Sequence, residues 1–218
     1  MNPNIPLILT LKRKSHKDIA EAQDRIIVEL YKVFDKAVLH GGTALWRCYK
    51  AHRFSEDIDV YIPRDIAKIT ALFENFKKAG FTIEKKKIGK NSIYSSLHIN
   101  GVLVRFEALF KKCKGFLHEY TKVDGNLVTV YTLTPEELIL EKLHTYQKRL
   151  KVRDLYDVFF LLRHVKMDHD IQKALRHLIN TFTRPVDESD LQVIIIEGIV
   201  PSVDDMITRI TRETTQRI

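Results

Sequence analysis

The chain has 218 residues, of which 44% are hydrophobic and 29% are charged, and its formal net charge is +8. This length and hydrophobic share predict a folded protein with a sizeable core and exclude wholesale disorder. No apolar run approaches the roughly 20 residues that span a bilayer, and Met1 to Leu11 lacks the basic segment of a secretory signal. With two widely separated cysteines, Cys48 and Cys113, the sequence predicts a cytoplasmic protein with reduced thiols and no membrane partner.

The excess of positive charge is concentrated in short clusters along the chain. They lie at residues 12–14, 85–87, 111–114 and 148–153. Scattered, solvated lysines would account for this pattern, and so would a basic surface that attracts polyanions. Composition does not separate the two interpretations.

The first quarter of the chain predicts a long helix followed by short elements. The helix is expected over residues 15–36 and opens with a pair, Ser15 and Asp18, at capping-box spacing. Its apolar face consists of Ile19, Ile26, Leu30, Val33 and Ala37. A short apolar stretch over 37–40 and a short helix over 44–50 come next.

A strand over residues 57–62 and a helix that stops at Gly80 lead into a β-rich middle. Candidate strands lie at 81–87, 92–99, 102–109 and 127–133. Asn100-Gly101 predicts a tight hairpin between two of them, and residues 124–126 predict a further turn.

The remaining chain is predicted to be helical. Thr134, Pro135 and Glu137 form a complete helix start, with helices expected over 134–149, 153–165 and 168–182. The apolar run 191–196 fits either a buried strand or a helix segment. The order predicts an α/β (α+β) fold in which a mixed sheet with flanking helices occupies residues 1–133 and a helical region occupies 134–218.

The candidate chemistry begins with Asp57 and Asp59. On a strand, residues two apart point to the same side, so both aspartates face away from Ile58 and Val60. Two carboxylates about 6–7 Å apart along a strand repel each other unless a cation lies between them. Such oxygen ligands suit Mg²⁺, which also takes substrate phosphates. A solvated strand edge is the alternative interpretation.

Gly41, Gly42 and Thr43 lie between the short apolar stretch and the short helix. Glycines allow a ligand to approach the backbone closely, and a helix N-terminus offers unpaired N–H groups. Thr43 would cap the helix or bond to a phosphate oxygen. A tight turn capped by Thr43 is the structural alternative.

Glu107 is a third candidate ligand, on the strand over 102–109. Val102, Val104 and Phe106 form the apolar face of that strand, so Glu107 lies on the other face. Phosphoryl transfer with two metal ions needs carboxylates that hold both ions. Asp57, Asp59 and Glu107 are therefore the candidate metal ligands, and a solvated surface position is the alternative interpretation of Glu107.

Taken in order, these parts resemble the nucleotidyltransferase (DNA polymerase β-like) superfamily. Residues 39–45 and 53–59 look like the AbiEii/AbiGii toxin branch of that superfamily. Residues 135–143, Arg149 and residues 153–157 are similar to the downstream motifs of the same branch. The resemblance covers residues 38–162.

The resemblance implies further site residues. Lys142 would bind the triphosphate of an NTP, together with Arg53 and the Gly41–Thr43 segment. One acidic residue of the next helix, Asp154 or Asp157, would support the active site as a base or as the partner of Lys142. From spacing alone, Asp157 would simply pair with Arg153, one helical turn away.

The implied activity is transfer of an NMP from an NTP, with Mg²⁺ or its substitute Mn²⁺, to an acceptor hydroxyl. The implied acceptor is RNA, at the 3′ end of tRNA, and the implied setting is a toxin–antitoxin or phage-defence system with a cognate antitoxin protein. Two alternatives stay open: a small-molecule nucleotidyltransferase of the antibiotic-modifying kind, and a non-catalytic nucleic-acid-binding relative. A basic groove beside Asp57 would favour RNA, and an acidic cleft would favour a cationic drug.

Overall fold

The computed structural model describes residues 6–216 and divides into two compact units. Unit 1 comprises Met1–Lys50 and Phe54–Thr132, and unit 2 comprises Ala51–Arg53 and Leu133–Ile218. The first five residues, on which part of the signal-peptide prediction rests, lie outside the described residues. No helix between residues 6 and 216 is long and apolar enough to cross a membrane.

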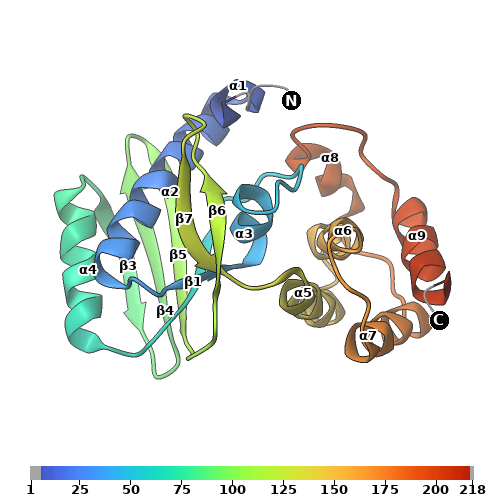
Figure 1. Ribbon diagram of the computed structural model, residues 1–218. Coiled ribbons are helices and arrows are strands. Elements are labelled where there is room, and N and C mark those ends of the chain that lie inside the picture. Colours follow the sequence, from blue (N-terminus) through green and yellow to red (C-terminus); the bar gives the residue numbers. More distant parts are fainter. Residues whose placement is uncertain (1–5, 217–218) are drawn as a thin grey trace. The chain divides into compact units, whose positions relative to one another are not determined.

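Unit 1 is built on a mixed seven-stranded sheet with the order β3-β4-β5-β2-β1-β7-β6 (Figure 1). Its strands are β1 Val38–His40, β2 Ile58–Ile62, β3 Thr82–Ile88, β4 Ser92–Ile99, β5 Val102–Phe110, β6 Phe116–Thr121 and β7 Leu127–Thr132. β2 runs parallel to β5 and β1 runs parallel to β7, whereas the other neighbours are antiparallel. The predicted α/β class with a mixed sheet is confirmed.

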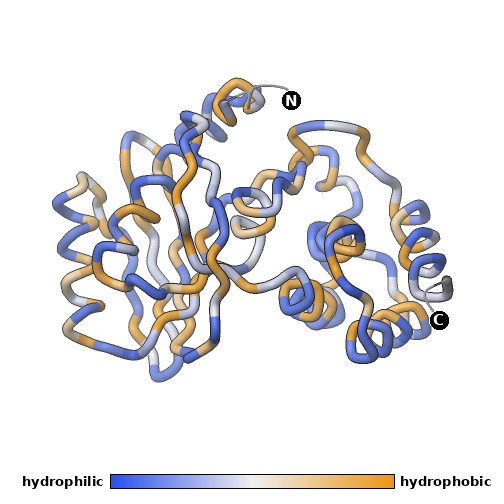
Figure 2. Tube along the Cα trace, in the orientation of Figure 1, coloured by the Kyte–Doolittle hydropathy of each residue, from blue (hydrophilic) through white to orange (hydrophobic). Residues whose placement is uncertain are grey.

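Helices α2 (Lys14–Val33) and α4 (Ile66–Lys78) pack against one face of this sheet (Figure 1). Hydrophobic and hydrophilic residues alternate along these helices and strands, as amphipathic elements require (Figure 2). The core between them is fully buried and includes Ile26, Leu30, Val60, Phe76 and Phe106. This packing fixes which side of each strand faces the core.

Several predicted elements of unit 1 differ from the structure. The N-cap of α2 is Arg13 with no side-chain cap, so the predicted capping role of Ser15 is wrong. The short helix, α3, spans Gly41–Arg47 and therefore includes both glycines in its first turn. β6 and the four-residue helix α1 (Leu7–Thr10) carry no strong local signal and were not predicted.

Three turn and helix-end motifs in the sequence correctly predicted the local structure. Asn100 and Gly101 both have positive φ, +50° and +80°, as a tight β4–β5 hairpin requires. Gly80, with φ +94°, follows the end of α4 as predicted. In unit 2, Thr134 and Glu137 form the predicted capping box at the start of α5.

Unit 2 consists of helices. They are α5 Pro135–Arg149, α6 Val152–Leu161, α7 His169–Asn180, the 3₁₀ helix η1 Glu188–Asp190, α8 Leu191–Ile194 and α9 Val203–Gln216. The ambiguous run 191–196 is helical up to Ile194, after which Ile195 forms an isolated antiparallel bridge with Arg53. The segment 51–53, which lies between α3 and β2 in the chain, is thereby bonded within unit 2.

Candidate functional site

Asp59 and Glu107 are neighbours on the sheet face that points away from α2 and α4. They are register partners on the parallel strands β2 and β5. Ile58 and Val60, on either side of Asp59, are fully buried in the core, so Asp59 points to the opposite face. Phe106, the neighbour of Glu107 on β5, is also fully buried in the core, so Glu107 points to the same face as Asp59. We call the face that carries Asp59 and Glu107 the carboxylate face.

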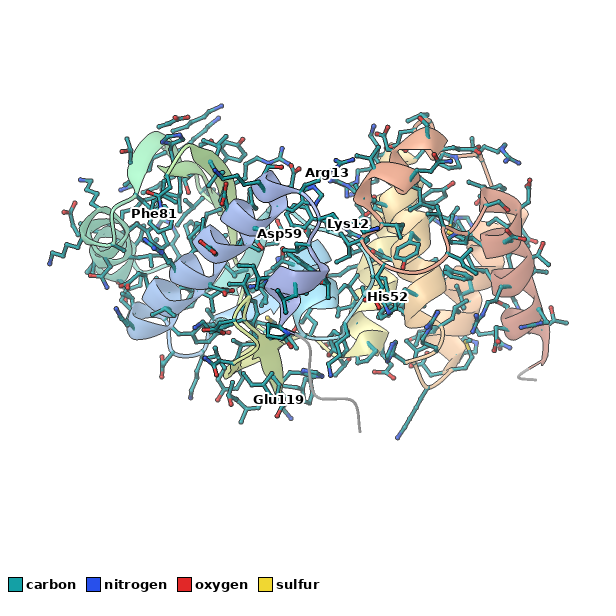
Figure 3. All side chains as sticks on the ribbon, turned by 90° about the horizontal axis from the view of Figure 1, so that it is seen from above. Lys12, Arg13, His52, Asp59, Phe81 and Glu119 are labelled. Carbon is teal, nitrogen blue, oxygen red and sulfur yellow. The ribbon has the colours of Figure 1, made fainter. Side chains whose placement is uncertain are left out.

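Gly41 lies directly against the Asp59 carboxylate. A Cβ atom added to Gly41 would lie 2.3 Å from Oδ2 of Asp59, closer than any real contact, and Gly41 has a φ of +69°. Only glycine satisfies both conditions. Figure 3 marks Asp59 among the side chains of unit 1. The first glycine of α3 is therefore required by the position of this carboxylate.

Thr43 stabilises the approach to β2. Its side chain is fully buried, and its hydroxyl donates a hydrogen bond to the backbone carbonyl of Asp57. The Thr43 hydroxyl is thus used to fix the chain immediately before the strand. Its predicted bond to a phosphate stays a prediction.

The Asp57 carboxylate pairs with Arg105 on β5. The Nε and Nη2 atoms of Arg105 lie 2.6 and 2.7 Å from the two Asp57 oxygens. Hydrogen bonding to Asp57 outweighs partial burial and raises the pKa of the Arg105 guanidinium, which is therefore charged. Arg105 was not among the predicted site residues, although alternation along the strand puts it on the same face as Glu107. Its position two residues before Glu107 was the available signal.

Within residues 6–216, no three or more His, Cys, Asp or Glu side chains converge closely enough to hold a metal ion. The chemistry of the donors nevertheless fits a hard divalent cation, because Asp57, Asp59 and Glu107 offer only carboxylate oxygens. Arg105 currently supplies the positive charge beside Asp57. Metal binding by all three carboxylates would therefore compete with the Arg105–Asp57 pair.

The predicted site residues of unit 2 form a second, buried network. Nζ of Lys142, on α5, lies 2.9 Å from Asp157 and 3.7 Å from Asp154. Both aspartates lie on α6 and are fully buried, and Lys142 is only 6% exposed. Asp157 is therefore paired with Lys142, and the alternative pairing with Arg153 is not the one observed.

Two arginines complete this network. Arg53 binds Asp157 through Nε and Nη2, at 2.5 and 2.6 Å, and Arg149 binds Asp154 at 2.6 and 2.9 Å. With Lys142, three cationic side chains share two carboxylates. Because buried charges need partners, this arrangement gives Lys142, Asp154 and Asp157 each an oppositely charged neighbour inside unit 2.

The titration behaviour of the Arg53–Asp157 pair agrees with its geometry. Burial alone would raise the pKa of Asp157, but Arg53 and Lys142 lower it below its ordinary value of 3.8. Burial would lower the pKa of Arg53, and Asp157 raises it. Both groups are ionised at neutral pH. Arg53 is only 3% exposed, so its guanidinium is committed to Asp157, and its predicted contact with a nucleotide stays a prediction.

The structure thus collects the predicted residues into two groups. Unit 1 holds Gly41, Gly42, Thr43, Asp57, Asp59 and Glu107, and unit 2 holds Arg53, Lys142, Asp154 and Asp157. Arg105 was missed as a member of these groups, and Arg149 was named only as part of a family motif, with no role in the site. Its place two helical turns after Lys142 was the signal for its role as a partner of Asp154.

The mixed sheet with its flanking helices is the fold that the sequence predicted from its resemblance to nucleotidyltransferases. Residues 25–213 match the family described as nucleotidyl transferase AbiEii toxin, type IV TA system. The chain belongs to this family and is a nucleotidyl-transferring enzyme.

Two solved structures share the fold over nearly the whole chain. JHP933 from Helicobacter pylori has a TM-score of 0.67 at 17% identity, covering 93% of this chain and 91% of that one. A second H. pylori protein has a TM-score of 0.65 at 18% identity, covering 93% and 94%. No curated protein sequence matches the chain significantly.

Proposed function

We propose that this enzyme transfers an NMP from an NTP to a hydroxyl of RNA, at the 3′ end of tRNA, with Mg²⁺ as its cofactor. The observation that carries the proposal is the pairing of Asp59 with Glu107 on one sheet face, with Gly41 closed against Asp59. These residues lie in a chain of a nucleotidyltransferase family. The proposal assigns the catalytic carboxylates to residues 1–133.

In this proposal Asp57, Asp59 and Glu107 would hold Mg²⁺, and the ion when bound would neutralise phosphate charge and activate the acceptor hydroxyl. The acceptor hydroxyl loses its proton to water, and its oxygen attacks the α-phosphorus of the NTP. The bond from the α-phosphorus to the oxygen that bridges it to the β-phosphorus breaks, and pyrophosphate leaves. The Gly41–Thr43 turn allows close approach of the nucleotide to the backbone.

Lys142, within residues 134–218, is proposed to bind the triphosphate. Asp157 and Asp154 would then position Lys142, because their ion pairs with its ammonium limit its rotamers. Arg53 would support Asp157 as a positioning residue, since both ends of its guanidinium fork lie on that carboxylate.

RNA is favoured over a cationic small molecule by the charges beside the carboxylates. Lys85 and Lys87 register with β4 residues whose β5 partners are Arg105 and Glu107. Positive side chains on the face that carries the reacting groups attract phosphates and repel an aminoglycoside-like cation. The family description supports a toxin role and a cognate antitoxin as a partner.

The test is incubation of purified protein with Mg²⁺, each labelled NTP in turn, and total tRNA. Wild type should label RNA, EDTA should abolish labelling, and Asp59→Ala should reduce it by at least about 100-fold. Asp35→Ala, which removes an exposed aspartate from the same unit, is the matched control and should retain full labelling. Labelling that survives Asp59→Ala would contradict the assignment of the carboxylates.

A further inference from the structure

Two rows of side chains run across the carboxylate face from its edge strand to the candidate site. The strand order places β3 at the edge, followed by β4, β5 and β2. In one row the successive register partners are Lys87, Tyr94, Glu107 and Asp59. In the adjacent row Lys85 registers with Ser96 and Ser96 with Arg105, which reaches Asp57. Both rows therefore begin with a lysine and end at a predicted metal ligand.

The lysines of β3 divide between the two faces of the sheet. Lys85 lies on the carboxylate face with its ammonium 5.0 Å from the ring centroid of Tyr94. Lys86, between the two others, points to the opposite face, with its ammonium 4.1 Å from the ring centroid of Phe73 on α4. All three lysines are exposed. The same strand thus offers two lysines toward the site and one away from it.

Lysines on an edge strand also discourage pairing with the edge of another sheet. That role would be served equally by lysines on either face, and it requires no aromatic neighbour. It does not account for the alignment of Lys87 and Tyr94 with the row that leads to Asp59, or of Lys85 with the row that leads to Asp57.

We propose that Lys85, Lys87 and Tyr94, which we call the edge strip, bind a single-stranded RNA segment whose 3′ end lies at Asp59. The proposal rests on the proposed function and adds the surface that receives the acceptor. Lysines neutralise the phosphates, and Tyr94 offers a ring for stacking with an unpaired base. Duplex RNA is disfavoured because its bases cannot reach Tyr94.

The sheet sets the length of RNA that the strip requires. Three strand spacings of about 4.8 Å separate β3 from β2, so the two lysines of the strip lie about 14 Å from Asp59. A stacked strand advances about 3.4 Å per nucleotide, so that distance corresponds to about four nucleotides. RNA shorter than this would not reach Lys87 from the site.

The test measures binding of fluorescent single-stranded RNA by anisotropy, over a series of salt concentrations. Lys85→Gln/Lys87→Gln should weaken binding several-fold and lower the salt slope by about 1.4, since each lost phosphate contact removes about 0.7. Lys86→Gln removes the same charge type from the same strand on the other face and should change neither quantity. Tyr94→Leu should weaken binding about fivefold or more.

The effect of the double variant should appear with an eight-nucleotide RNA and vanish with a dinucleotide. The inference is overturned if Lys86→Gln has the same effect as the double variant, if the double variant binds like wild type, or if duplex RNA binds as tightly as a single strand. RNA binding is measured without NTP, so the result does not depend on nucleotidyl transfer. If the protein transferred no nucleotide, the proposed function would be refuted, but the binding test would still show whether the edge strip binds RNA.

Discussion

The contact between Gly41 and Asp59 makes Gly41→Ala a sharp test of the candidate site. The added methyl group would lie 2.3 Å from Oδ2 of Asp59, whereas ordinary contacts begin near 3.4 Å. The carboxylate must therefore move by about 1 Å, a displacement that can lower a catalytic rate about 100-fold. The φ of +69° adds about 1–2 kcal/mol of strain, and the clash adds about 1–3 kcal/mol.

Gly101→Ala provides the matched control for this experiment. Gly101 has a φ of +80°, and a Cβ added there would meet no atom within 4 Å. It should cost about 1–2 kcal/mol of stability, from backbone strain alone, and leave activity unchanged. Urea unfolding measures the free energy of unfolding of both variants, and labelling of tRNA measures their activity at temperatures where both are folded.

Comparison of the two variants separates the effect of backbone strain from the effect of displacing the Asp59 carboxylate. Gly41→Ala should lose more stability than Gly101→Ala and should alone lose nucleotidyl transfer. Equal activity in the two variants, or wild-type activity in Gly41→Ala, would refute the argument that Gly41 is required by the position of Asp59.

Two further predictions follow from the ion pairs. Arg105→Gln should tighten binding of Mn²⁺ about three- to tenfold, because the half-exposed Arg105–Asp57 pair is worth about 1 kcal/mol and a metal ion would no longer compete with it. Electron paramagnetic resonance of free Mn²⁺ measures the affinity. Lys86→Gln, which removes a charge on the other face of the sheet, is the control and should have little effect. Unchanged Mn²⁺ binding in Arg105→Gln would contradict the competition between Arg105 and the metal ion for Asp57. The lowered pKa of Asp157 predicts that its contribution to stability is complete above its ordinary pKa of 3.8 and is lost as the pH falls through its lower folded value. The free energy of unfolding of the wild type should therefore drop steeply below about pH 4. Asp157→Asn should be less stable than wild type at pH 7 by about 3–5 kcal/mol and should lack this acid-dependent loss. If both proteins lose stability equally at low pH, Asp157 is not the group responsible.

Much of the site could be predicted because alternation along a strand is a local property. Asp57 and Asp59 flank Ile58, and Glu107 follows Phe106, so their common direction away from the core follows from the pattern of apolar residues. The hairpin at Asn100-Gly101 and the capping box at Thr134 were equally local, because each is set by residues within one turn. β6 was missed because its residues 116–121 lie at a sheet edge with little burial to impose a pattern.

The sequence by itself determined the secondary structure around the site, the sidedness of its carboxylates and the family of the chain. Only the tertiary structure decided their partners, because a partner depends on which distant segments the fold brings together. Arg105 reaches Asp57 from 48 residues away, and Arg53 reaches Asp157 from 104 residues away. The alignment of Lys87 and Asp59 likewise required the strand order, since no spacing in the sequence specifies that β4 and β5 lie between them.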